Sequence, residues 1–344
     1  MKKMVLLIIA ACFLCSVAVY AGGGGEAASP APSTAKAEPK IVLKIGHSSA
    51  ATDPREQGAL MIKKLAEERS GGSLTVETYP AGQLGGDAAL IEALALDSGN
   101  PNMLISDLSN FATYEPRMGM SALPFMFSDF DKAWAFMDSE VEADAEKLLI
   151  AHNIHVLGHF CNGFRCVTAS KIQARTPADM KNMLIRTPEN PVIMATMRAL
   201  GANPQPLAFN EVYMALQQGT YDGQENPIPI IYNNKLYEVQ KYLSVTNHIY
   251  SGMAVAIAES VWKGMSADQQ KILQAAIREA ETFNRSTNRK MTEDFISKLE
   301  TSGMTILKPD LSAFVKATAV VKEDAGKQYG KEWMDRLDAW LKSH

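Results

Sequence analysis

The segment YDGQENP, residues 221–227, brings two carboxylates and an amide into one short stretch of chain. Asp222 and Glu225 lie three residues apart, and a pair of carboxylates is the acid–base machinery of most glycoside hydrolases. Such pairs normally come from separate elements and lie about 5 to 9 Å apart across a sugar. We therefore expect Asp222 to bind backbone N–H groups and Glu225 to pair with a basic neighbour, with no catalysis by either.

Three histidines, His152, His155 and His159, raise the question of a metal site. His155 and His159 share one face of an expected strand, whereas His152 ends the preceding helix. No carboxylate or thiolate completes a ligand set at the usual spacing, so we predict no metal site and leave the three roles open. The sequence also has no phosphate-cradling Walker loop and no G-x-S-x-G elbow. The sequence therefore lacks the signatures of these two enzyme classes.

Strand and helix patterns alternate along the rest of the chain. Strands are predicted at 40–46, 73–80 and 102–106, and again at 155–160 and 164–169. Helices are predicted at 54–70, beginning after an Asp53 cap, and at 86–99, 191–201 and 209–219. This alternation indicates an α/β fold with mostly parallel sheets. About 300 residues exceed what one core usually covers, so two lobes are expected.

One predicted helix is unusually long. Residues 266–302 contain no proline and no glycine, and their apolar residues keep helical spacing. At 1.5 Å per residue such a helix approaches roughly 50 Å, which is too long for one lobe. We expect it to span both lobes, which suits a protein that hinges about a cleft.

The N-terminus is typical of an exported protein. Lys2 and Lys3 precede an uncharged apolar run, which predicts a signal peptide over residues 1–21. The run around Cys12 also resembles a lipoprotein box, so a form lipidated at Cys12 and a cleaved soluble form both stay open. Residues 22–40 are rich in Gly, Ala, Ser and Pro and predict a disordered linker. We expect a periplasmic protein.

The charge pattern excludes some partners. The formal net charge is −4, and no basic patch or interleaved aromatic–arginine run is present, so nucleic acid is not an expected partner. No second apolar segment is long enough to cross a bilayer. Cys161 and Cys166 lie five residues apart on extended chain, where they point to opposite faces, so two unpaired thiols are expected.

Five motifs together resemble the substrate-binding proteins of tripartite ATP-independent periplasmic (TRAP) transporters. They occur in the order found in that family, and the likeness covers nearly all of residues 41–344. The motifs are YPAGQLGGD (79–87), LPFMF (123–127), MLIRTPENPV (183–192), LGANPQPLAFNEVYMALQQGTYDGQENP (200–227) and SVTNHIY (244–250). The resemblance implies a two-lobed, hinged receptor that needs no cofactor and is not an enzyme. It is expected as a monomer that closes around a small organic anion and delivers it to TRAP membrane subunits.

The resemblance also implies roles for residues of the second lobe. Arg186, in the IRTP motif, is expected to form a paired salt bridge with the ligand carboxylate, since a guanidinium offers two parallel donors. Arg165 is expected to assist, Asn226 to hydrogen-bond the same end, and Phe209 to lie against the carbon skeleton. His248 falls at a position that lines the cleft in some members.

The first lobe is expected to hold the far end of the ligand. The loops GHSS, GGD and SDLSN supply the candidates His47, Ser48, Asp87 and Asp107. These groups suit hydroxyls, which favours a sugar acid such as a hexuronate or an aldonate. The alternative is a C4-dicarboxylate or another small organic acid. A C4-dicarboxylate would need a second cation in the first lobe, whose candidates are mainly acidic or neutral. An exported sugar-acid hydrolase and a sensor lobe are further alternatives.

The family layout gives boundaries for the two lobes. The first lobe is expected at 41–163 plus 252–291 and the second at 164–251 plus 292–344. In the segment quoted first, Gly223 is expected to let the chain turn so that Asn226 faces the ligand, and Pro227 to begin the next helix.

Overall fold

The computed structural model describes residues 38–344. The predicted signal peptide, the lipidation site at Cys12 and nearly all of the predicted linker lie outside the described residues. Within residues 38–344, no helix combines the length and the apolar character that a membrane span requires.

The chain begins with alternating strands and helices, as predicted. The first part contains β1 (Ile41–Gly46), α1 (Pro54–Arg69), β2 (Leu74–Tyr79), α2 (Asp87–Ala95), β3 (Met103–Asp107), η1 (Leu108–Thr113), η2 (Pro116–Ala122), α3 (Phe130–Met137), α4 (Glu140–Leu148) and η3 (Leu149–His152). Asp53 caps α1 by accepting from the Arg55 amide at 2.9 Å. The helix α2 ends at Ala95 and not at Gly99, because Asp97 adopts the left-handed conformation that closes it.

The second part continues the alternation and ends in helices. It contains β4 (Ile154–Ala169), η4 (Pro177–Met180), β5 (Leu184–Thr187), α5 (Pro191–Ala199), β6 (Asn203–Pro206), η5 (Phe209–Glu211), α6 (Val212–Gln217), β7 (Gly223–Pro227), α7 (Ile228–Asn233), η6 (Leu236–Glu238) and β8 (Tyr242–Ala258). The remaining elements are α8 (Glu259–Gly264), α9 (Ala267–Thr301), β9 (Thr305–Leu307), α10 (Ser312–Tyr329) and α11 (Lys331–Ser343).

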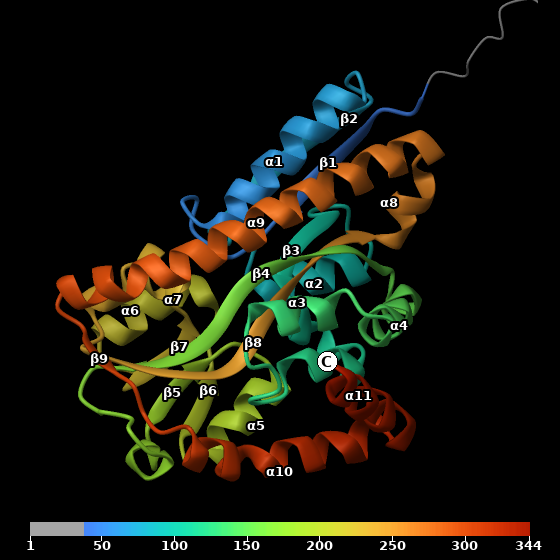
Figure 1. The fold of residues 1–344 in the computed structure, drawn as a ribbon. Helices are drawn as coiled ribbons and strands as arrows, with labels where there is room; N and C mark the ends of the chain where they lie inside the picture. The colour runs from blue at the N-terminus through green and yellow to red at the C-terminus, as the bar shows by residue number, and fades with distance from the viewer. Residues whose placement is uncertain (1–37) are drawn as a thin grey trace, which may run out of the picture. The chain divides into compact units, whose positions relative to one another are not determined.

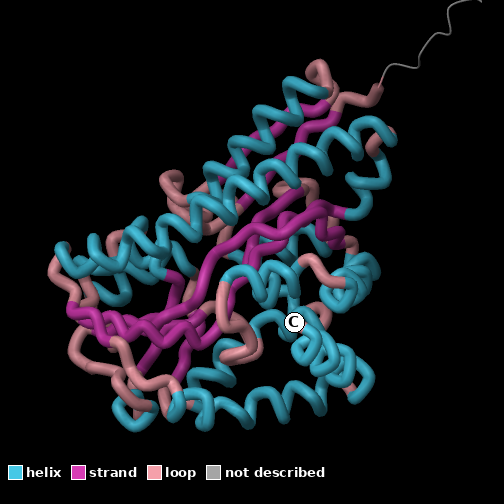
Figure 2. Tube along the Cα trace, in the orientation of Figure 1, coloured by secondary structure: helices cyan, strands magenta, loops and turns pink. Residues whose placement is uncertain are grey.

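The strands form one continuous sheet in the order β2-β1-β3-β8-β4-β7-β5-β6, with β9 beside β8. Figure 2 shows this sheet as a band that runs through the described residues. Pairing is parallel among β1, β2 and β3 and among β5, β6 and β7. The long central strands β4 and β8 are antiparallel to each other, and they pair antiparallel with β7 and β3 respectively. The parallel arrangement predicted from the sequence therefore holds at both ends of the sheet, and two antiparallel strands join them.

The two strands predicted at 155–160 and 164–169 are one strand, β4. Its pairing with β8 shifts register at three places, including the step from Cys161 to Gly163, where Gly163 has φ +118°. Such bulges bend a strand without ending it. A bent β4 can therefore connect the two parallel groups of strands. The sequence patterns on either side of the bulge do not show that the strand is continuous.

The long helix was predicted correctly. Ser266 caps α9 in a capping box with Gln269, and the helix runs for 35 residues. Its first half packs on α1 and its second half reaches α7, as Figure 1 shows. In the middle, Asn284 Oδ1 accepts from the Cys161 amide at 2.7 Å and Asn288 Nδ2 donates to the Cys161 carbonyl at 2.7 Å. These bonds fasten α9 to the β4 bulge between the two lobes.

Separate hydrophobic cores fill the two lobes. One cluster surrounds β1, β2 and β3 and includes Leu273 and Ile277 of α9. Another lies under α6 and α7 and includes Phe295 and Leu299 from the other end of α9. A two-lobed α/β fold is therefore confirmed. The helix α10 begins on the core around β5 and also contacts η2, and α11 packs with α4. The lobe boundaries stay a prediction, since several elements contribute to more than one core.

The segment 221–227 is built differently from the turn that was expected. Gly223 begins β7 and does not have a positive φ, so the expectation of a turn at this residue is wrong. A Cβ at position 223 would collide with the Thr168 carbonyl and the Met183 methyl, so glycine is required by close packing against β4. Pro227 ends β7 and precedes α7 directly. Cys161 and Cys166 are free, as predicted, and both are buried.

Candidate functional site

Arg186 lies on β5, where burial leaves its side chain only 3% exposed. Its Nε and Nη2 atoms donate to the Leu207 carbonyl at 2.9 and 2.5 Å, and its guanidinium lies 5.7 Å from the centre of the Phe209 ring. Within residues 38–344 it forms no ion pair, and its Nη1 has no hydrogen-bond partner. Burial lowers the pKa of Arg186 to about 10, because the charged form is poorly compensated. The fold thus holds a buried cation with unused donors.

Arg165 on β4 is bonded quite differently. Its Nε lies 2.5 Å from Glu225 Oε2 and its Nη2 lies 2.7 Å from Glu225 Oε1. Burial opposes charge on both groups, but their mutual attraction outweighs it, so the pKa of Arg165 is raised and that of Glu225 is lowered. Glu225 does pair with a basic neighbour, as expected. Asp222 Oδ2 accepts from the Leu184 amide at 2.8 Å, also as expected.

Asn226 lies beside this ion pair on β7. Its Oδ1 accepts from Arg165 Nη2 at 3.2 Å, and its Nδ2 donates to Gln224 Oε1 at 2.5 Å. The ion pair and the amide are thereby fixed to each other before any ligand binds. Strand pairing between β4 and β7 sets their geometry, so Arg165, Glu225 and Asn226 keep their relative positions without a ligand.

The first-lobe candidates Ser48, Asp87 and Asp107 also lie together. Ser48 Oγ lies 3.1 and 3.0 Å from the two carboxylate oxygens of Asp87. Asp107 accepts from the Ser109 amide at 2.9 Å and from the hydroxyls of Ser109 and Ser251. Asp107 Oδ2 lies 3.9 Å from Arg165 Nη1, so this carboxylate faces the second lobe.

These residues enclose an inner cavity of about 30 Å³. Seven of the nine predicted site residues line it: Ser48, Asp87, Asp107, Arg165, Arg186, Phe209 and Asn226. An outer cavity of about 680 Å³ shares Asp87, Arg186 and Phe209 with it and is also walled by α2 and by residues 206–208. The inner cavity has the volume of about one water molecule, so a ligand of several carbon atoms enters only if the two walls separate.

The two predicted histidines do not line either cavity. His248 is fully buried, with its Nδ1 2.8 Å from Thr246 Oγ1 and its Nε2 3.2 Å from Glu225 Oε2. Burial lowers the pKa of His248, although Glu225 opposes the shift. His47 is fully buried as well, with its Nε2 2.8 Å from Glu56 Oε2. Each ring is instead bonded to a buried carboxylate, His47 to Glu56 and His248 to Glu225.

The sequence analysis did not single out Arg55. This residue is 4% exposed, lines the inner cavity, and has its Nη1 3.4 Å from both Ser48 Oγ and the Ile105 carbonyl. A signal was present, because Arg55 follows Pro54 in the first turn of α1, where the helix dipole disfavours a cation. Asn110 and Asn162 also line the cavity and were not predicted.

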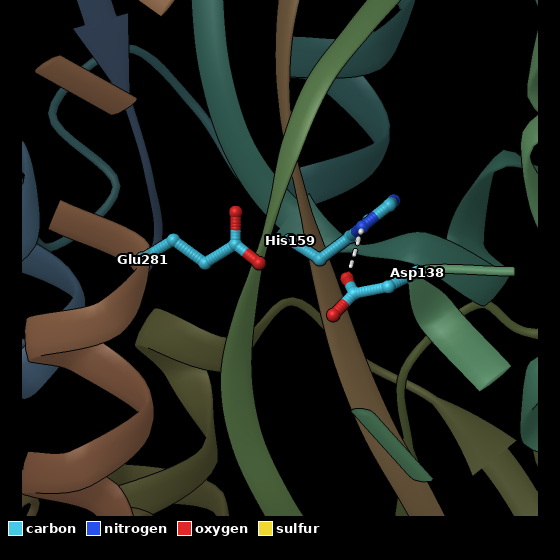
Figure 3. Close-up of side chains that lie close together, drawn as sticks. All are labelled: Asp138, His159 and Glu281. Atoms are coloured by element: carbon cyan, nitrogen blue, oxygen red, sulfur yellow. Dashed lines mark ion pairs between the residues drawn. The ribbon is translucent and has the colours of Figure 1, made fainter. Parts of the chain in front are cut away.

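The three histidines considered for a metal site do not converge. His155 Nδ1 lies 2.6 Å from Glu259 Oε2, and His152 lies edge-on to the Tyr114 ring. His159 lies near Asp138 and Glu281, three groups that could offer ligands to one ion. Figure 3 shows Glu281 on α9, and Asp138 paired with His159. Arg285 bonds Asp138 at 2.7 Å and Glu281 at 2.5 Å, so a cationic side chain already occupies this carboxylate cluster.

Comparison with known proteins gives consistent matches. Residues 45–328 match the family described as bacterial extracellular solute-binding protein, family 7. The 2,3-diketo-L-gulonate-binding periplasmic protein YiaO of Escherichia coli K12 is 33% identical over 265 residues, which cover 77% of this chain and 80% of that protein. The C4-dicarboxylate-binding periplasmic protein DctP of Rhodobacter capsulatus is 32% identical over 314 residues, covering 89% of this chain and 92% of that protein.

A solved structure extends this likeness to three dimensions. The crystal structure of a TRAP periplasmic solute-binding protein from Polaromonas sp. JS666, bound to D-erythronate, superimposes with a TM-score of 0.83. The two sequences are 31% identical, and the match covers 87% of this chain and 98% of that one.

Proposed function

Because the chain belongs to family 7 of the bacterial extracellular solute-binding proteins, we propose that it captures a sugar acid for a TRAP transporter. The protein is a periplasmic receptor that works with TRAP membrane subunits, and it is not an enzyme. The sugar acid is a hexuronate or an aldonate, bound where the inner and outer cavities share Asp87, Arg186 and Phe209. The relatives support this class, since one is named for 2,3-diketo-L-gulonate and a solved neighbour holds D-erythronate.

The single observation that carries the proposal is the unpaired guanidinium of Arg186. A buried cation with spare donors costs free energy, and an anion that binds there removes this cost. The ligand carboxylate binds Arg186, with Arg165 and Asn226 beside it and Phe209 against the carbon chain. Ser48, Asp87 and Asp107 bind the hydroxyls at the other end.

The proposed mechanism is closure of the two lobes around the ligand. The inner cavity is too small to admit a sugar acid in the conformation described, so capture begins with the lobes apart. The connections that bend are β4, β8 and α9, which run through both lobes. Closure excludes water from the arginine–carboxylate contact and thereby strengthens it.

A C4-dicarboxylate is the second candidate, favoured by the likeness to DctP of Rhodobacter capsulatus. Arg55 supplies a cation at the first-lobe side of the inner cavity, but Asp87 lies 3.9 Å from it and already compensates its charge, which argues against a second carboxylate there. Carboxylates that lie close together in a buried site repel each other.

A thermal-shift screen with uronates, aldonates, dicarboxylates and keto acids tests the proposal. A ligand present at one hundred times its dissociation constant stabilises the folded state by about 2.7 kcal/mol. We expect the largest shift from a uronate or an aldonate. A larger shift from succinate than from every sugar acid would support the second candidate, and no shift from any organic acid would contradict both.

A further inference from the structure

Arg55 is a buried arginine that the surrounding protein does not satisfy. A guanidinium carries five N–H donors. Of the Arg55 guanidinium nitrogens, only Nη1 makes hydrogen bonds to the described residues, both at 3.4 Å, and the buried Nε has no partner. Buried donors without partners are costly, so the fold alone does not explain why this side chain is kept inside.

The helix position of Arg55 adds to this cost. Arg55 is the second residue of α1, next to the positive end of the helix dipole. A cation in the first turn is disfavoured there, whereas Glu56 in the same turn is favoured. The unpaired donors and the helix dipole therefore both disfavour the position of Arg55 at the wall of the inner cavity.

The groups around Arg55 form a donor–acceptor set. Asp87 Oδ1 lies 3.9 Å from Arg55 Nη1, and Ser48 Oγ lies between them in the hydrogen-bond chain. A hydroxyl group fits such a set, because it can accept from Arg55 and donate to Asp87 at the same time. A carboxylate does not fit, because it can only accept and would bring a second negative charge beside Asp87.

We propose that Arg55 and Asp87 together bind a hydroxyl at the end of the ligand remote from its carboxylate. This subsite rests on the proposed function, in which Arg186 binds the carboxylate. Arg186 on the second lobe and Arg55 on the first then bind the two ends of one ligand molecule. The arrangement selects a polyhydroxy monocarboxylate over an acid that carries carboxylates at both ends.

Isothermal titration calorimetry with D-galactonate and galactarate tests the subsite. The two ligands share one carbon skeleton, and galactarate carries a second carboxylate in place of the terminal hydroxymethyl group. We expect wild type to bind galactonate at least about 10-fold more tightly than galactarate. Arg55→Gln should weaken galactonate binding by about 10-fold or more, since it removes a charge-assisted donor.

Asp87→Asn provides the opposite signature. This change removes the negative charge that opposes a second carboxylate. We therefore expect the affinity for galactarate, relative to that for galactonate, to rise about 10-fold. Arg69→Gln is the matched control, because Arg69 lies at the other end of α1 and pairs with Glu279 on the surface. Its affinities should equal those of wild type. If Arg55→Gln does not fold, Arg55→Lys, which keeps the charge, replaces it in the affinity measurements.

The outcomes separate this inference from the proposed function. Wild type that binds no sugar acid overturns the proposed function and the subsite with it. Wild type that binds galactonate while Arg55→Gln binds it equally well overturns the subsite alone. A uniform loss of affinity for both ligands in Arg55→Gln, with the ratio unchanged, also overturns it, because that result is what a purely structural arginine gives.

Discussion

The carboxylate of Glu225 is held by two atoms of the Arg165 guanidinium, at 2.5 and 2.7 Å, and both side chains are buried. Arg165 therefore enters ligand binding with its charge already compensated. Arg186 lines the same cavity. It has no carboxylate partner among residues 38–344 and donates to the Leu207 carbonyl instead. The two arginines are therefore bonded differently, and in the proposed function Arg186 receives the anion while Arg165 shapes the site.

Replacing Arg186 by methionine should have opposite effects on stability and on binding. The depressed pKa of Arg186 means that its charge costs free energy in the folded protein without ligand. We expect Arg186→Met to leave the free energy of unfolding of the ligand-free protein unchanged, or to raise it by about 1 kcal/mol. Urea unfolding measures this, with the exposed Arg198→Met as control. A loss of several kcal/mol would show that Arg186 is structural.

Arg165 should respond in the reverse way. Arg165→Met leaves the buried Glu225 without its guanidinium partner, with the His248 ring still 3.2 Å away, and should lower the free energy of unfolding by about 3 to 5 kcal/mol. The double variant Arg165→Met, Glu225→Met removes both charges and should recover most of this loss. Urea unfolding of the three proteins without ligand measures the coupling. Additive losses in the double variant would contradict the tight pairing described here.

Gly223→Ala tests the packing of the segment 221–227. The added methyl group meets the Thr168 carbonyl, which belongs to the paired strand β4 and cannot move aside alone. We expect a loss of about 1 to 3 kcal/mol, or a failure to fold. Gly264→Ala is the control, because no atom lies near its added methyl group and its φ is not positive. Equal stability of both variants and wild type would contradict the close approach.

The carboxylate cluster around His159 predicts a pH dependence of stability. Burial opposes charge on His159, but Glu146 and Asp138 outweigh it and raise its pKa from 6.5 to about 10. A raised histidine pKa stabilises the fold fully below the unfolded value of 6.5, and this stabilisation is lost as the pH rises through 10. His159→Gln should therefore cost more stability at pH 6 than at pH 10.

Urea unfolding at pH 6, 8 and 10 measures the difference between wild type and His159→Gln. His152→Gln is the control, because His152 is an exposed histidine outside the carboxylate cluster. A difference for His159→Gln that grows with pH would contradict the raised pKa.

Much of this architecture follows from local sequence. Asp53, Ser266 and the apolar spacing of residues 266–302 define helix starts and lengths, because capping and periodicity are local properties. The continuity of β4 was not predictable in the same way. The bulge between Cys161 and Gly163 is stabilised by Asn284 and Asn288, which are more than 120 residues distant. Gly223 was read as a turn for the same reason, because its real constraint is a contact with β4.

The candidate site was predicted mainly from its resemblance to a family. That resemblance led to Arg186, Arg165 and Asn226, which the structure brings to one cavity. Arg55 was missed because the loop motifs around it drew attention to His47 and Ser48. Burial, which sequence alone does not give, is what distinguishes Arg55 from an ordinary surface arginine.

The central claim is that Arg186 binds the carboxylate of a sugar acid. Isothermal titration calorimetry of D-galactonate binding to wild type and to Arg186→Met at pH 7 tests it most directly. The account predicts clear binding to wild type and an affinity at least about 100-fold weaker for the variant, because two charge-assisted hydrogen bonds are lost. Equal affinity for both proteins would contradict it.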